Sequence, residues 1–159
     1  MLVILLLPIL LIGCSESIPE GYYGYDQEKV ETAVKELSFQ PKLPQFVPIE
    51  VDFLISDQYQ DTDTKAEALD VSFYTQDNDL LSIQFIEGEV NEKFIRPEKI
   101  NLTEQIHAEY VDNTYAQILL WQQDDITYKM TYRSSTVNKQ SNKDINKNKL
   151  VKVARSFHS

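Results

Sequence analysis

The sequence of 159 residues is poor in the residue types from which most catalytic and metal sites are built. Cys14 is its only cysteine, so the chain cannot form an internal disulfide or a cysteine-rich metal site. Only two histidines and four glycines occur, and the sequence contains neither a His-Glu-x-x-His motif nor a glycine-rich phosphate loop. We therefore expect no catalytic residue, no bound metal and no cofactor, and predict that the protein is not an enzyme.

Basic residues are scarce over most of the chain. Up to Asp125 there are 7 Lys and Arg against 24 Asp and Glu, a net charge of −17, whereas the remainder holds 8 against 1, a net charge of +7. A strongly acidic body disfavours nucleic acid as a partner. The basic C-terminal part suits anionic lipid headgroups, or else forms a solvated helix face that partly neutralises the acidic body.

The N-terminal apolar run, Leu2–Ile12, is too short to cross a membrane. As a helix it rises about 16 Å, roughly half of a ~30 Å hydrocarbon core, which suits the hydrophobic region of a signal peptide. The run ends in Leu11-Ile12-Gly13-Cys14, which resembles the lipobox of bacterial lipoproteins, although no Lys or Arg precedes it. The resemblance implies cleavage between Gly13 and Cys14 and acylation of the Cys14 thiol. The alternative is a buried N-terminal strand.

This interpretation predicts three parts of the chain and a location. Residues 1–13 form a lipoprotein signal peptide, residues 14–25 a lipidated tether, and residues 26–159 a single extracytoplasmic domain. The expected location is the extracellular face of the cell membrane of a Gram-positive bacterium, with the membrane reached through the lipid anchor on Cys14. Two acyl chains give a stable attachment where one chain gives a marginal one.

Two stretches of the domain have helical periodicity. Asp26 is a suitable N-cap for a helix that ends at about Ser38, and a second helix is expected over about residues 143–157. Between the first helix and the next element, Phe39–Pro48 contains three prolines, which favour an extended crossover. The apolar positions on single helix faces are Val30, Ala33, Val34 and Leu37 in the first helix, and Leu150, Val153, Ala154 and Phe157 in the second.

The middle of the chain has the alternation of half-buried strands. Its clearest hairpin turns at Gln123-Asp124-Asp125, with Ile126, Tyr128, Met130 and Tyr132 facing inward in the second arm. Residues 88–103 look irregular. The strands are expected at about residues 51–59, 69–73, 81–85, 105–110, 115–122 and 126–133.

The predicted fold class is α+β, a curved antiparallel sheet of about five to six strands with the N- and C-terminal helices packed on one face. Some strands are apolar on both faces, so the sheet either curls around the helices or leaves an apolar groove. The groove would be lined by residues such as Phe73, Phe85 and Trp121.

Two polar features have ordinary surface roles in this interpretation. His107 is expected to form a solvent-facing pair with Glu109. The acidic loop around Asp61 and Asp63 fails the spacing of an EF-hand, because Ser72 occupies the twelfth position counted from Asp61. It is therefore expected to be a solvated loop.

Several segments together resemble a known domain family. They are Leu37-Ser-Phe39, Pro41-Lys-Leu-Pro44-Gln-Phe-Val-Pro48, Leu81-Ser-Ile83-Gln84-Phe85, Leu120-Trp121-Gln122-Gln-Asp-Asp-Ile126-Thr-Tyr128 and Leu150-Val-Lys-Val-Ala154-Arg-Ser156-Phe157. The order is similar to that of an uncharacterised domain family of Bacillota lipoproteins and of the outer domains of some membrane-bound anti-sigma factors. The resemblance covers about Asp26 to Phe157, and departs at Phe46–Glu50, where the family often has a Pro-Glu-Gly turn.

Two functions follow as hypotheses. The first is a non-enzymatic binding or sensory domain of the cell envelope, with an envelope protein or an amphiphile as its ligand. The alternative is a carrier of lipids or lipoproteins that holds acyl chains in a groove of the curved sheet, which rests on an analogy of fold with the half-barrels of lipoprotein carriers.

Overall fold

A computed structural model describes residues 17–135 and 145–157 of the chain. Within these residues the chain forms two helices and seven strands. In chain order the elements are α1 (Gln27–Lys35), β1 (Phe53–Gln60), β2 (Glu67–Tyr74), β3 (Leu80–Glu87), β4 (Glu98–Asn101), β5 (His107–Asp112), β6 (Gln117–Gln123), β7 (Ile126–Arg133) and α2 (Lys147–Ser156). None of the helices in the described part of the chain is long and apolar enough to cross a membrane.

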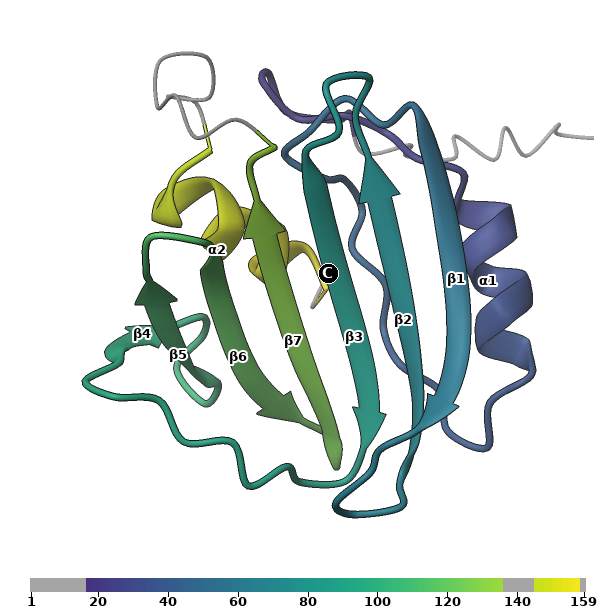
Figure 1. Cartoon of the computed structure of the whole chain (residues 1–159), viewed down its shortest axis with the longest axis vertical. Coiled ribbons are helices and arrows are strands. Elements are labelled where there is room, and N and C mark those ends of the chain that lie inside the picture. Colours follow the sequence, from purple (N-terminus) through teal and green to yellow (C-terminus); the bar gives the residue numbers. More distant parts are fainter. Residues whose placement is uncertain (1–16, 136–144, 158–159) are drawn as a thin grey trace, which may run out of the picture.

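The strands form one open antiparallel sheet in the order β1-β2-β3-β7-β6-β5-β4 (Figure 1). The α+β class and the antiparallel sheet are confirmed, whereas the expected five to six strands are too few. The missed strand is β4, which lies in the stretch interpreted as irregular. It has four residues with no buried position, so its sequence carries no alternating pattern.

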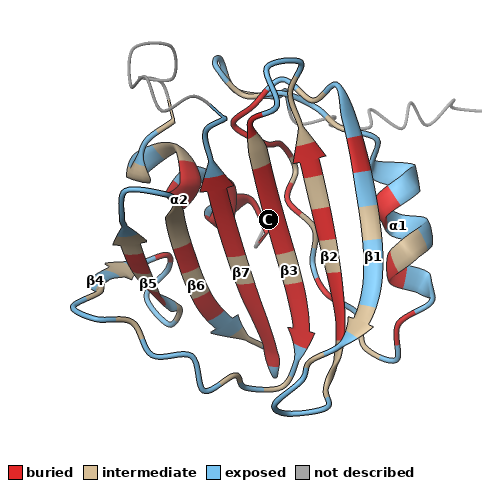
Figure 2. Ribbon diagram, viewed as in Figure 1, coloured by how far each residue is buried: buried red, intermediate tan, exposed pale blue. Residues whose placement is uncertain are grey.

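Most of the buried apolar residues of the sheet lie on one face, which we call the inner face. The strand register aligns Val71 with Ile83, Met130 and Leu119 across the four central strands. All four are essentially inaccessible to solvent. Figure 2 shows that burial is concentrated in β2, β3 and β7, the middle of the sheet. The inward residues predicted for the second arm of the hairpin, Ile126, Tyr128, Met130 and Tyr132, are all buried.

Both helices lie on the inner side of the sheet (Figure 1). The helix α1 begins where expected, since the Asp26 carboxylate accepts a hydrogen bond from the Lys29 backbone N–H at 3.1 Å. It ends at Lys35, three residues before the predicted end. The helix α2 begins at Lys147, because the Asn146 side chain caps it by accepting a bond from Lys149 N–H. Residues 143 and 144 of the predicted second helix lie outside the described residues.

The proline segment Phe39–Pro48 passes behind β2 and β3 on the same side as the helices (Figure 1). The Lys42 backbone N–H donates to the Tyr128 hydroxyl at 3.1 Å, and the Gln45 N–H donates to Ser156 Oγ in α2 at 3.2 Å. Val47 is fully buried. The crossover therefore completes the covering layer, which is a closer association with the core than the sequence suggested.

An aromatic cluster fills the space between the sheet and α2. Trp121 stacks on Tyr128 with a centroid separation of 5.1 Å and an interplanar angle of 5°. Phe157 meets these two rings edge-on at 5.2 and 5.5 Å, and Phe85 meets Tyr128 edge-on at 5.8 Å. Such edge-to-face pairs stabilise a fold beyond the area they bury.

This packing corrects the expected apolar groove. Phe73, Phe85 and Trp121 retain 1, 1 and 2% of their accessible surface. Tyr25 packs edge-on against Phe73 at 5.2 Å, and Phe157 closes over Phe85 and Trp121. The three residues form part of the packed core because the chain's own helices and proline segment cover the inner face.

The β6–β7 hairpin turns at the predicted place. Asp124 and Asp125 both have positive φ, 52° and 59°, which is the sign pattern of the two-residue turn that matches the twist of antiparallel strands. Aspartate tolerates this conformation better than most residues with a side chain. The Asp125 carbonyl also accepts a hydrogen bond from Gly88 N–H at 2.7 Å, which fixes the start of the chain between β3 and β4.

We predict that Trp121 contributes packing and little hydrogen bonding. Its Nε1–H is buried without a hydrogen-bond partner among the described residues. Trp121→Ala should lower the free energy of unfolding by about 3–5 kcal/mol, as for other buried aromatic residues. Trp121→Phe should cost less than Trp121→Ala, because it keeps an aromatic ring and removes an unsatisfied donor. Urea unfolding followed by circular dichroism measures both, and equal losses would contradict this assignment.

Candidate functional site

The N-terminal segment that precedes α1 packs against the domain. Tyr23 and Val47 exchange two backbone hydrogen bonds of 2.8 and 2.9 Å. Tyr22 meets Phe46 edge-on at 4.9 Å, and the Tyr25 hydroxyl donates to the Pro44 carbonyl at 2.6 Å. Burial raises the pKa of Tyr25. The part of the predicted tether from Tyr22 to residue 25 therefore belongs structurally to the domain, while Gly13 and Cys14 lie outside the described residues.

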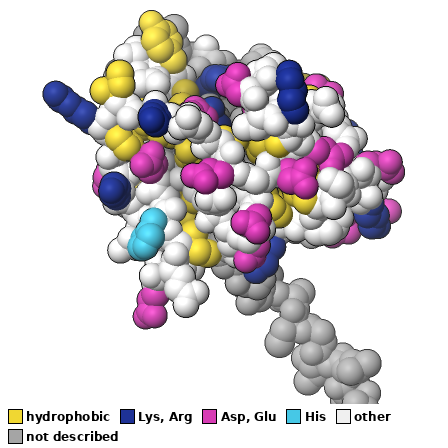
Figure 3. All heavy atoms as spheres, turned by 90° about the horizontal axis from the view of Figure 1, so that it is seen from below, with side chains coloured by type: hydrophobic (Ala, Val, Ile, Leu, Met, Phe, Trp, Pro, Cys, Tyr) yellow, Lys and Arg dark blue, Asp and Glu magenta, His cyan; other side chains and the backbone are white. Residues whose placement is uncertain are grey.

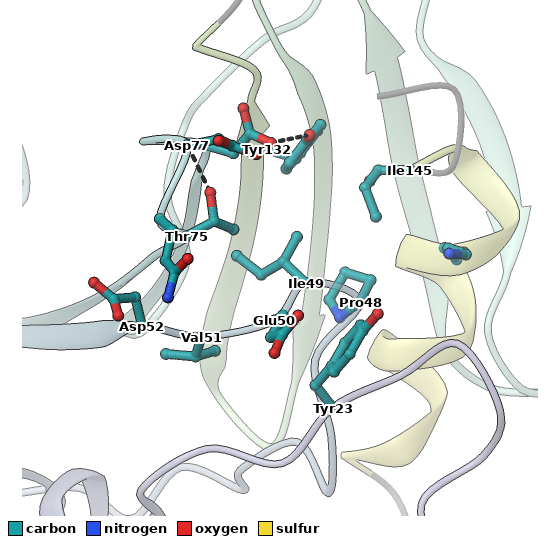
Figure 4. A pocket seen from close by; sticks show the side chains of 13 residues that line it. Tyr23, Pro48, Ile49, Glu50, Val51, Asp52, Thr75, Asp77, Tyr132 and Ile145 are labelled. Carbon is teal, nitrogen blue, oxygen red and sulfur yellow. Dashed lines mark hydrogen bonds between the residues drawn. The ribbon is translucent and has the colours of Figure 1, made fainter. Parts of the chain in front are cut away.

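A polar pocket opens beside this segment (Figure 4). It has a volume of about 340 Å³. Its walls come from the end of the proline crossover, the β2–β3 turn, the C-terminal part of β7, the residues around the start of α2, and Tyr23. Four carboxylates line the pocket, those of Glu50, Asp52, Asp77 and Asp79. The cation that lines it is Lys149.

Hydrogen bonds hold one wall of the pocket in place. Asp79 is only 5% exposed, and its carboxylate accepts bonds from the Ser135 backbone N–H at 2.8 Å and from the Tyr132 hydroxyl at 3.3 Å. The Asp79 backbone N–H donates to Thr75 Oγ1 at 3.0 Å. Burial raises the pKa of Tyr132, and the adjacent Asp79 carboxylate raises it further. This wall is consequently preorganised, with a phenol held in its neutral form.

The chemistry available in the pocket is attraction of positive charge. Carboxylates on an open wall next to the Tyr23 ring favour a cationic group over an anionic one. No cluster of three or more His, Cys, Asp or Glu side chains in the described part of the chain has an arrangement suited to a metal ion.

The second candidate is on the outer face of β1 and β2. We call Phe53, Ile55, Tyr59 and Tyr74 the aromatic patch. Phe53 is 47% exposed and Ile55 51%, and Figure 2 shows β1 as largely exposed. Phe53 and Tyr74 stack with centroids 4.7 Å apart and an interplanar angle of 10°. Their pairing across the β1–β2 register presents a flat aromatic surface to solvent.

Carboxylates border the aromatic patch. A hollow of about 320 Å³ is lined by Ile55, Tyr59 and Tyr74 together with Asp57, Asp70 and Ser72. The Asp70 carboxylate accepts bonds from the Ser72 and Ser82 hydroxyls, both at 2.8 Å, which orient it. Burial raises the pKa of Tyr59 to about 12, with a further contribution from the Asp70 charge. The patch therefore combines aromatic faces with fixed negative charge.

The sequence carried a signal for the aromatic patch that the prediction did not use. Phe53 and Ile55 alternate with Leu54, so β1 is apolar on both faces, but only Leu54 is buried. The prediction recognised strands that are apolar on both faces and placed the resulting groove on the inner face. The helices close that face, and the apolar residues left exposed are on the outer one.

The remaining polar candidates have local structural roles. His107 is exposed, and its Nδ1 lies 2.8 Å from Asn101 Oδ1 on β4, so its side-chain partner is Asn101 where Glu109 was expected. Asp61 accepts three hydrogen bonds from Asp63 and Thr64, which organise its loop, and those from Thr64 lower the pKa of the Asp61 carboxyl.

Figure 3 shows acidic side chains recurring across the end of the molecule that is seen from below.

The buried phenols predict a loss of stability at high pH. The folded chain holds Tyr132 protonated, whereas the unfolded chain releases this proton at about pH 10. The contribution of the buried tyrosine to the free energy of unfolding is therefore fully present below about pH 10. Above this pH the free energy of unfolding falls, by at most ~1.4 kcal/mol per pH unit for each buried tyrosine. Tyr132→Phe should make the fall shallower in urea unfolding measured from neutral to alkaline pH. Tyr115→Phe is the control, because Tyr115 is 83% exposed, and the same slope in all three proteins would contradict the prediction.

Comparisons with known proteins add no assignment to this geometry. No protein-family model, curated protein or solved structure matches the chain. The resemblance to the domain family of Bacillota lipoproteins therefore stays a prediction that rests on the segments quoted from the sequence.

Proposed function

We propose that the protein is a lipoprotein of the bacterial cell envelope, anchored through Cys14, whose domain binds another envelope protein without catalysing a reaction. The observation that carries the proposal is the sequence Leu11-Ile12-Gly13-Cys14 at the end of an apolar run, followed closely by a folded domain. A lipid on Cys14 and a domain that begins packing at Tyr22 give the two parts that a membrane-tethered binding protein needs.

The chain between Cys14 and Tyr22 is short, which supports the proposal that the domain is held at the membrane surface. Eight residues separate Tyr22 from Cys14, and a fully extended chain spans at most about 3.5 Å per residue. Tyr22 therefore stays within about 28 Å of the anchor, which keeps the domain where it meets proteins that are themselves at the membrane.

The aromatic patch supports protein binding over acyl-chain binding. Acyl chains need an enclosed apolar space, and the residues expected to line one are packed in the core. Exposed aromatic rings bordered by carboxylates resemble the composition of protein interfaces, where aromatic side chains anchor and polar groups surround them. A segment of a partner protein that carries Lys or Arg beside an apolar residue fits this surface.

The anchor is tested by variants of the cysteine. The native chain should be recovered in the membrane fraction with the mass of residues 14–159 plus its acyl groups, and Cys14→Ser should carry none. Gly13→Cys/Cys14→Gly is a matched control with the same composition, and it should also lack acylation because Ile12 replaces the small residue before the thiol. Intact-mass measurement of membrane and soluble fractions reads out both variants. A native chain without acyl groups would refute the anchor.

Binding at the aromatic patch is tested by cross-linking in living cells. A photoreactive amino acid at Ile55 should give one defined cross-linked product, and Asp57→Asn/Asp70→Asn should reduce its yield several-fold. Ile95 is the control position because it is also an apolar residue with 91% exposure but lies in the chain between β3 and β4. Cross-linking that is absent at Ile55, or the same from both positions, would contradict the assignment of the patch.

A further inference from the structure

Three of the four positive charges of the helix α2 lie on one side of it, and the fourth, Lys147, is paired with Glu98. Lys149, Lys152 and Arg155 follow one another at three-residue spacing, which places them along one face of a helix. The opposite side of α2 is buried and contains Leu150, Val153 and Ala154. We call the three cations the basic face of α2. The helix contains no Asp or Glu.

The cations of the basic face have no carboxylate partner within the described residues. The ion pairs found there join Lys129 to Glu92 and Lys147 to Glu98. Arg155 donates to the backbone carbonyls of Leu102 at 3.1 Å and of Asn101 at 3.0 Å, which orients the guanidinium group without neutralising its charge.

The helix dipole favours only one of these three cations, Arg155, which is in the last turn. Lys149 is in the first turn, where the helix dipole favours negative side chains and disfavours positive ones. Lys152 holds its ammonium group 4.9 Å from the centroid of the Tyr22 ring, a contact that again leaves the charge in place. In a chain with a formal net charge of -10, this face is a local concentration of unneutralised positive charge.

The segment before α1, from which the chain leads to Cys14, contacts this same face. The Tyr22 ring lies beneath Lys152, and a Cβ added to Gly21 would lie 3.8 Å from Lys149 Nζ. Gly21 is seven residues from Cys14, so the anchor lies at most about 25 Å from Gly21. Two independent observations, the unneutralised cations and the point from which the chain leads to its lipid, thus coincide on one side of the molecule.

We infer that the basic face of α2 lies against anionic phospholipid headgroups and fixes the orientation of the domain on the membrane. The inference rests on the lipid anchor of the proposed function. Each cation near an anionic membrane surface strengthens contact about fivefold, so three strengthen it on the order of a hundredfold. Lys149 also lines the polar pocket, whose carboxylates oppose this attraction, whereas Lys152 and Arg155 do not line it.

The acylated chain, purified and reconstituted in vesicles, tests the inference. Because Cys14 is the only cysteine and its thiol is acylated, one engineered cysteine takes a fluorescent label at a single place. Asn148→Cys labels the exposed side of α2, and Thr62→Cys labels the β1–β2 loop, which is far from α2 in Figure 1. Energy transfer to headgroup-labelled lipid reports how near each label is to the membrane.

The expected result is a dependence on lipid charge at one label only. Transfer from position 148 should rise severalfold when phosphatidylglycerol is added to phosphatidylcholine vesicles, and high salt should reverse the rise. Transfer from position 62 should stay low in both. Lys149→Gln/Lys152→Gln/Arg155→Gln should abolish the rise, with circular dichroism confirming that the variant is folded.

A matched control removes the same charge elsewhere. Lys35→Gln/Lys65→Gln/Lys93→Gln takes three exposed cations from outside α2 and should leave the rise unchanged. Equal transfer with and without phosphatidylglycerol, or the same loss in both triple variants, would overturn the orientation while leaving the anchor in place. A chain that carries no acyl groups would overturn the anchor, and the orientation with it.

Discussion

The closed core depends on the ring of Tyr128. Its face stacks on Trp121 of β6, its edges meet Phe85 of β3 and Phe157 after α2, and its hydroxyl accepts a hydrogen bond from the proline segment at Lys42. One side chain thus joins three strands, the C-terminal helix and the crossover. The burial that these contacts cause raises the pKa of Tyr128. These contacts help to hold the covering layer against the sheet, and the described residues of the inner face are packed without an opening for a ligand.

The position of β7 explains both how the core closes and which surface remains open. The strand lies between β3 and β6 and pairs with both. It therefore joins the strands β1–β3 to the strands β4–β6 at the centre of the sheet. The chain after β3 must therefore travel past β7 to reach the far edge. It is held there by the Thr127 hydroxyl, which donates to the Gly88 carbonyl at 2.7 Å, and by the 2.7 Å ion pair of Lys129 with Glu92. This excursion covers Thr127 on the outer face, whereas nothing in the described residues covers the outer face of β1.

Local sequence patterns predicted the elements well because each element carries its own signal. The Asp26 cap, the alternation in β7 and the turn at Asp124 and Asp125 all depend on residues that are close together in the sequence. The strand order and the closed inner face depend on contacts between distant segments, such as Gln45 with Ser156, and no local pattern reports these. The strand β4 pairs only with β5, and its residues are too few and too exposed to alternate. For the site, the sequence predicted that the two helices cover one face of the sheet, but not that the proline segment completes this cover and leaves no groove.

The closed core and the distribution of charge lead to one arrangement of the whole molecule. The aromatic patch is on the outer face of the sheet, and α2 is on the inner side, so the acidic aromatic surface and the basic helix face opposite directions. If α2 rests on anionic headgroups, the patch turns away from the membrane toward whatever approaches from outside. The same negative charge that attracts a Lys- or Arg-bearing segment to the patch is repelled by the lipid surface, so it opposes the inverted orientation. In the proposed orientation, this separation of charge across one sheet would hold the domain in a single orientation on the membrane and would present the aromatic patch outward.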